Sequence, residues 1–179
     1  MAVRIGELQD STLVARRLGT MRSVTCTGRA YLEQYGKPKH PDDLRQHIGL
    51  QYSNISYKQQ WRYETPEGRT VHAQPQIRIR ANNGEALAVA ASAGLGITTG
   101  PTFILGSYLK KNKLVAILNE YQRPPAGIYA VYPPGRLVPR RIQVFSDFLA
   151  GRYGDHPYWD GGLGVAQQSL AHSPVDAGN

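Results

Sequence analysis

The stretch IRIRANNGEALAVAASAGLGITTGP, residues 77–101, decides the fold class of this chain. An alternating run ends at two asparagines, and an alanine-rich apolar segment follows. The alternation predicts a strand over 75–80, and the apolar segment predicts a helix over 84–93. A second extended run, 95–99, comes next. A strand, a helix and a strand in this order predict an α/β unit.

The turn between the strand and the helix is a candidate binding site. Asn82 is the predicted N-cap, because its side-chain oxygen can accept from the first turn and Glu85 stands three residues on, as in a capping box. Gly84 lets another group approach the backbone closely. Unpaired N–H groups at a helix start favour anions or carbonyls, and α/β folds bind ligands where strands end. The alternative, that these residues only cap the helix, stays open.

The rest of the chain also interleaves strands and helices, which favours an α/β architecture over a sandwich or a bundle. Strands are expected at 3–6, 12–19, 23–27, 114–118 and 128–133, a hairpin at 61–73, and helices at 29–35, 40–47 and 138–152. The last helix has one apolar face at helical spacing, made of Val138, Ile142, Phe145, Phe148 and Leu149. Residues 154–179 are rich in glycine, serine and alanine and are predicted to be a disordered tail.

The charge balance and the cysteine usage narrow the function classes. Lys and Arg number 21 against 13 Asp and Glu, which gives a net charge of +8. This balance favours acidic partners such as nucleic acid, an anionic membrane surface or small anions, although a solvated basic surface explains it equally well. Cys26 is the only cysteine, which suits a reducing cytoplasm. No signal peptide and no run approaching roughly 20 apolar residues is present, so we expect a cytoplasmic protein without membrane contact.

Patterns that carry catalysis or metal binding are missing from the sequence. It has no G-x-S-x-G, P-loop or H-E-x-x-H motif. The five histidines are dispersed at no metal-ligand spacing. Cys26 lies in an apolar strand without an adjacent histidine, which is typical of an inert core thiol. We therefore predict that the chain is not an enzyme and holds no cofactor and no metal.

Several segments, in order and spacing, resemble the effector-binding domain of LysR-type transcriptional regulators over about residues 3–153. They are VRIGEL and TLVARRLG near the start, CTGRAYLEQYGKPKHPDDLRQH at 26–47, YETPEG at 63–68, ANNGEALAVAASAGLGITTGP at 81–101, LVAILNEY at 114–121 and IYAVYPPGRLVPRRIQVFSDFL at 128–149.

This resemblance implies a two-lobed fold like that of periplasmic binding proteins. Two crossing strands would lie near 24–27 and 128–132. Residues 1–27 and 128–153 would form the first lobe, and residues 28–127 the second. The family's opening β-α unit and its winged helix-turn-helix have no counterpart in this sequence. The first lobe is therefore expected to be incomplete.

The resemblance also implies the partners of the chain. These are a small-molecule effector between the lobes, further copies of the chain in a homo-oligomer, and DNA only through a winged helix-turn-helix domain that this sequence lacks. A free-standing solute-binding module of the same fold is the alternative, and the missing signal peptide speaks against it.

The effector site is expected to bind a small anion, because a helix start and an arginine both favour negative charge. Its predicted lining is Thr27, Arg29, Asn82, Asn83, Gly84, Thr98 and Thr99. In the first lobe, the strands at 3–6 and 128–133 are expected to run parallel in one sheet. The helix bearing Ile142, Phe145 and Phe148 would cover that sheet, and an open edge with an apolar patch would favour self-association.

Overall fold

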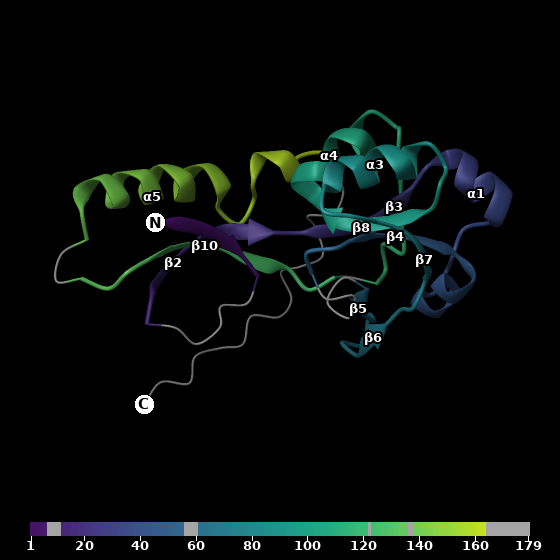
Figure 1. The fold of residues 1–179 in the computed structure, drawn as a ribbon, viewed down its shortest axis with the longest axis horizontal. Helices are drawn as coiled ribbons and strands as arrows, with labels where there is room; N and C mark the ends of the chain where they lie inside the picture. The colour runs from purple at the N-terminus through teal and green to yellow at the C-terminus, as the bar shows by residue number, and fades with distance from the viewer. Residues whose placement is uncertain (7–11, 56–60, 122, 136–137, 164–179) are drawn as a thin grey trace.

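The structure is a computed structural model that describes residues 1–6, 12–55, 61–121, 123–135 and 138–163. Figure 1 shows two lobes end to end, each with a β-sheet covered by helices. Lobe one holds strands β1 (Ala2–Ile5), β2 (Val14–Met21) and β10 (Ala126–Tyr132) under helix α5 (Arg140–Tyr153). Lobe two holds the remaining strands and helices. The predicted α/β fold with two lobes is confirmed.

The sheet of lobe one has the order β1-β10-β2, and both pairs are antiparallel, with Ala2 opposite Val131. The prediction that the strands at 3–6 and 128–133 run parallel was therefore wrong. A strand's own residues favour extended backbone in either direction. The direction is fixed by the partner strand and by the connection between the two.

Helix α5 packs on this sheet through a different face from the one predicted. Leu149 is buried in the core of lobe one and Ile142 packs against it, whereas the side chains of Phe145 and Phe148 are 48% and 61% exposed. The buried face of α5 also includes Ser146 and Ala150. At about 100° per residue its centre lies between Ile142 and Ser146, which leaves Phe145 and Phe148 outside it. These two rings form an exposed apolar patch. The helix covers the sheet as predicted, but Phe145 and Phe148 do not take part in that packing.

The sheet of lobe two has the order β7-β4-β8-β3-β9. Strands β7 (Gln76–Ala81), β4 (Ile48–Tyr52) and β8 (Ile97–Pro101) are parallel. Strand β3 (Ser23–Thr27) is antiparallel to β8 and to β9 (Val115–Ile117). Parallel β-α-β connections like these match the strand, helix and strand predicted around residues 77–101.

Helices cover one face of this sheet, and a hairpin covers the other (Figure 1). Helices α3 (Gly84–Ser92) and α4 (Thr102–Lys110) bury a core around Leu50 and Leu87. The helix α1 (Arg29–Tyr35), the 3-10 helix η1 (Pro41–Gln46) and the hairpin of β5 (Arg62–Glu64) and β6 (Thr70–His72) bury a second core around Trp61, Tyr63 and Ile97. The segment predicted as a helix over 40–47 is thus a 3-10 helix.

Before helix α5 the chain crosses between the lobes twice, at Arg22 between β2 and β3, and again between β9 and β10. The expected crossings near 24–27 and 128–132 lie instead inside strands of separate sheets. Strand β3 belongs to the sheet of lobe two, although the sequence assigned residues up to 27 to the first lobe.

The chain does not lose its order after helix α5, as we had expected from residue 154 onward. Gly154 pairs with Gly19 of β2, and the short 3-10 helix η2 (Tyr158–Asp160) packs against α4. Trp159 contacts the rings of Phe103 and Tyr153. Packing of these aromatic rings stabilises an ordered conformation, although the residues around them are rich in glycine. Residues 164–179 of the predicted tail lie outside the described part.

Candidate ligand-binding site

The start of α3 is closed by its own cap. Asn83 is the N-cap, and its side-chain oxygen accepts from the N–H groups of Glu85 (2.9 Å) and Ala86 (3.2 Å). The prediction that Asn82 caps the helix was wrong by one residue. Because two of the helix-start donors are already used and Glu85 adds a negative charge in the first turn, this end attracts an anion less than the sequence suggested.

Two of the predicted site residues lie at the opposite end of α3 from the turn at 82–84. The hydroxyl of Thr27 donates to the carbonyl of Gly96, just before β8 begins (2.8 Å). The N–H of Gly28, next to Arg29, donates to the carbonyl of Ala91 in the last turn of α3 (2.9 Å). Helix α3 has nine residues, or roughly 13 Å of length. The structure therefore does not bring Thr27 and Arg29 together with the turn.

The two neighbouring threonines of β8 point to opposite faces of the sheet, because side chains alternate along a strand. Thr98 lies opposite Cys26, in the layer under α3 and α4, and its hydroxyl donates to the carbonyl of Leu50 (3.3 Å). Thr99 lies opposite Thr25 on the face of the hairpin. Only Thr99 can therefore contribute to a site on that face.

Thr99 belongs to a buried group of polar side chains that we call the polar cluster, made of Thr25, Tyr63, Thr99 and Arg123. The hydroxyls of Thr25 and Tyr63 are 2.9 Å apart, and Thr25 also donates to Thr99 (3.3 Å). Arg123 donates to the hydroxyl of Thr99 (2.7 Å) and to the carbonyl of Arg62 (3.3 Å). The cluster joins β3, β5 and β8 to the second crossing.

Burial sets the electrostatics of the polar cluster. It raises the pKa of Tyr63 to about 12, although the hydrogen bond with Thr25 and the nearby charge of Arg123 act in the opposite direction. Burial also lowers the pKa of Arg123, whose guanidinium carbon lies 6.0 Å from the centre of the Tyr63 ring. A guanidinium keeps its proton at neutral pH even so, and the cluster carries a half-buried positive charge.

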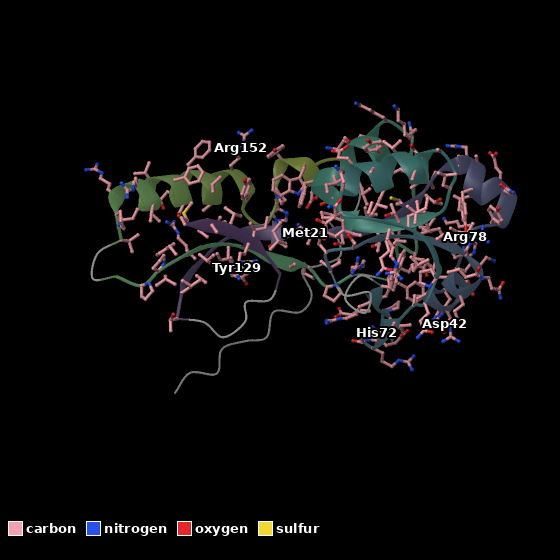
Figure 2. The ribbon with its side chains drawn as sticks, in the orientation of Figure 1. Met21, Asp42, His72, Arg78, Tyr129 and Arg152 are labelled. Carbon is pink, nitrogen blue, oxygen red and sulfur yellow. The ribbon has the colours of Figure 1, made fainter. Side chains whose placement is uncertain are left out.

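The polar cluster and the turn at 82–84 lie toward the same edge of the sheet in lobe two. The parallel strands β4, β7 and β8 all end at this edge, which faces the two crossings. The carbonyl of Arg22 accepts from the N–H of Thr102 at the start of α4 (2.9 Å). A Cβ on Gly84 would lie 2.7 Å from Ile104, so the starts of α3 and α4 touch. In Figure 2, Met21 marks the place where the lobes meet.

Sequence reasoning missed the arginine of the polar cluster. Arg123 stands in the irregular segment between β9 and β10, where no periodicity assigns it a partner. Only its proline-rich surroundings and its positive charge could have singled it out.

Metal and membrane sites have no support among the residues that the structure describes. Within them, no three His, Cys, Asp or Glu side chains gather where a metal ion could be held. None of the helices in the described part is long and apolar enough to cross a membrane.

Two α/β lobes joined by two crossing segments define the class of domains that are built like periplasmic binding proteins. The comparison with known families agrees with this class. The family model described as LysR substrate binding domain matches residues 1–154. The chain belongs to this family.

Relatives of the chain are transcriptional regulators. An uncharacterized HTH-type transcriptional regulator of Haemophilus influenzae is 39% identical over 146 residues, which is 82% of this chain and 50% of that protein. The HTH-type transcriptional activator AaeR of Escherichia coli is 35% identical over 83% of this chain and 48% of its own length. The chain thus spans about half the length of the curated relatives it matches.

Solved structures of the same family are similar to this fold. The full-length virulence activator AphB of Vibrio cholerae has a TM-score of 0.72 and 30% identity, covering 83% of this chain and 50% of AphB. The regulatory domain of CrgA from Neisseria meningitidis has a TM-score of 0.70 and 27% identity, covering 85% of this chain and 75% of that domain.

Proposed function

We propose that this chain senses a small anion for a transcription regulator and binds it in the interlobe cleft that the family fold implies. The observation that carries the proposal is Arg123. Its guanidinium is half-buried on the second crossing, and the hydroxyl of Thr99 and a backbone carbonyl fix its direction. A partly desolvated, oriented guanidinium forms strong charge-assisted hydrogen bonds to a carboxylate.

The predicted site is narrowed accordingly. Thr99 and the turn at 82–84 lie toward the edge that faces the crossings, so they stay in the proposed site beside Arg123. Thr27, Arg29 and Thr98 are left out, because the first two lie at the other end of α3 and Thr98 points into the core under the helices.

Thermal shift with a panel of small carboxylates and aromatic acids tests the proposal. A ligand that binds only the folded state raises the melting temperature with concentration. Replacing Arg123 with methionine removes a charged hydrogen-bond donor of about 1.5–3 kcal/mol, so binding should weaken roughly 10- to 100-fold. Arg78 is exposed on β7, toward the far end of lobe two (Figure 2), and Arg78→Met is the matched control.

Two results would contradict the proposal. One is a panel in which neutral analogues stabilise the chain as well as the carboxylates do. The other is an Arg123→Met chain that binds its carboxylate as tightly as the Arg78→Met control.

We propose further that DNA is contacted outside residues 1–163, through a helix-turn-helix region of the kind after which the relatives are named. The proposal also includes that the protein is cytoplasmic and forms a homo-oligomer. The 179-residue chain, with its net charge of +8, should then bind DNA only weakly, and added salt should abolish that binding. Site-selective, salt-resistant binding by this chain alone would contradict this part of the proposal.

A further inference from the structure

Residues 155–163, which we call the strap, begin on lobe one. Gly154, just before the strap, forms hydrogen bonds to strand β2 through both of its backbone polar groups. Its N–H donates to the carbonyl of Leu18 (3.2 Å), and its carbonyl accepts from the N–H of Thr20 (3.0 Å). Asp155 adds side-chain bonds to lobe one, since it accepts from Arg17 (2.9 Å) and Thr20 (2.8 Å). The first residue of the strap is therefore fixed to β2.

The other end of the strap lies on lobe two. Figure 1 shows η2 beside α4, on the helical side of the molecule. The ring of Trp159 meets that of Phe103 edge-on, with centroids 5.9 Å apart, and Lys110 donates to the Trp159 carbonyl (3.2 Å). Gly106 of α4 leaves room for Leu163, because a Cβ there would lie 3.0 Å from the Leu163 side chain. The strap is thus a third connection between the lobes.

The strap also holds the first crossing directly. The guanidinium of Arg22 donates to the carboxylate of Asp160 (3.1 Å) and to the carbonyl of Asp155 (2.9 Å). Asp160 is only 3% exposed. Because the carbonyl of Arg22 accepts from the N–H of Thr102, one residue of the crossing joins the strap to the start of α4.

The ion pair of Arg22 and Asp160 contributes more to the relative orientation of the strap and the first crossing than to the stability of the fold. Among the residues that the structure describes, neither the second carboxylate oxygen of Asp160 nor the Nε of Arg22 has a hydrogen-bond partner. Buried ion pairs with incomplete hydrogen bonding add little net stability, since desolvation offsets their attraction. Their directional bonds still fix how the two segments sit against each other.

We propose that the strap clasps the two lobes across the first crossing and limits how far they rotate. Domains with two lobes open and close at short crossing segments, and any third connection restrains that motion. Rotation at Arg22 would pull Asp160 away from its guanidinium or lift η2 from α4. Helix α4 directly follows β8, the strand that carries Thr99. The strap is therefore connected through α4 to the polar cluster. The family match ends at residue 154, and the strap lies beyond it.

The distance between the lobes in solution tests the clasp, and no ligand is needed. Spin labels can be placed on the exposed positions Glu33 of α1 and Arg141 of α5 through Glu33→Cys and Arg141→Cys. Cys26 is fully buried, and burial raises the pKa of its thiol, so it should not be labelled. Pulsed electron–electron double resonance then reports the distribution of distances between the two labels.

Asp160→Asn should broaden this distribution and shift its mean, because the variant removes the charge that holds Arg22. The matched control is Asp147→Asn, which breaks the exposed pair of Arg16 and Asp147 inside lobe one. It should leave the distribution unchanged. A chain ending at Gly154 should show the largest effect, whereas a chain ending at Leu163 keeps the strap and should match the full chain.

Unchanged distributions in both the Asp160→Asn chain and the chain ending at Gly154 would overturn the proposal. Hydrogen exchange of α3 shows whether lobe two stays folded in each chain. If the chain ending at Gly154 loses this protection, the test rests on the Asp160→Asn chain alone. A broader distance distribution in that chain supports the proposal, and an unchanged distribution overturns it. Because no ligand takes part, failure of the clasp is separate from failure of the proposed anion site.

Discussion

Replacing Tyr63 with phenylalanine should weaken the folded state at neutral pH and make it less sensitive to alkali. The hydroxyl of Tyr63 is fully buried, 2.9 Å from that of Thr25. Its removal leaves a buried hydroxyl with one partner fewer, which costs about 1 kcal/mol of unfolding free energy. Thr25 keeps its bond to Thr99 (3.3 Å), so the loss should stay near the low end of the range for buried polar groups.

The alkaline effect has the opposite sign. Burial raises the pKa of Tyr63 from its ordinary value of 10.0 to about 12. Above pH 10 the unfolded chain loses this proton first, so the stability of the native protein falls with rising pH. The loss reaches about 1.4 kcal/mol at pH 11, and the Tyr63→Phe chain does not suffer it. Near pH 11 the two chains should therefore be about equally stable.

Urea unfolding followed by circular dichroism, at neutral pH and at about pH 11, measures both effects. Cys26 titrates in alkali too, but both chains share its contribution. Tyr35→Phe is the matched control, because Tyr35 is 47% exposed and its loss should change neither value. A stability difference between the Tyr63→Phe chain and the unmodified chain that is the same at both pH values would refute the reasoning.

Three further perturbations test the core, the helix cap and the acid response. Leu50→Ala should cost roughly 2–5 kcal/mol in urea unfolding, because Leu50 is fully buried between the sheet and its helices, and a loss below about 1 kcal/mol would contradict this core. Asn83→Ala should cost about 1 kcal/mol and speed hydrogen exchange in the first turn of α3, whereas an equal effect of Asn82→Ala would show that the cap is misassigned. Burial lowers the pKa of His47, so stability should decline as the pH falls below about 6.5, where the unfolded chain takes up the proton first. His47→Gln should remove that part of the decline in an acid titration of unfolding, and an identical decline in both chains would rule His47 out.

Local features could be predicted from the sequence because their causes are local. The helix expected over 84–93 is found at Gly84–Ser92, where periodicity and an asparagine cap fix its start. The choice between Asn82 and Asn83 as the cap depends on where β7 leaves the sheet. That point is set by pairing with β4, a segment some 30 residues earlier in the chain, and not by the turn itself.

The candidate site was harder to predict because it depends on distant pairings. Thr98 and Thr99 must point to opposite faces of the sheet, but the register of β8 against β3 decides which of the two faces the hairpin. Arg29 lies near α3 in the fold, but at the wrong end of the helix. Arg123 comes to Thr99 only through the second crossing, and no local pattern encodes that contact.

The first two strands must wait for their partner during synthesis. Ala2 pairs with Val131, so the ribosome must add 131 minus 2, that is 129, further residues after Ala2 to complete the pair. At about 5–20 residues per second, roughly 6 to 26 s pass before that partner is made. The strands of lobe two all lie between Ser23 and Ile117, so its sheet can form earlier. Until β10 emerges, the apolar residues of β1 and β2 have no sheet to join, and this interval is when a chaperone, or a neighbouring nascent chain, would meet them.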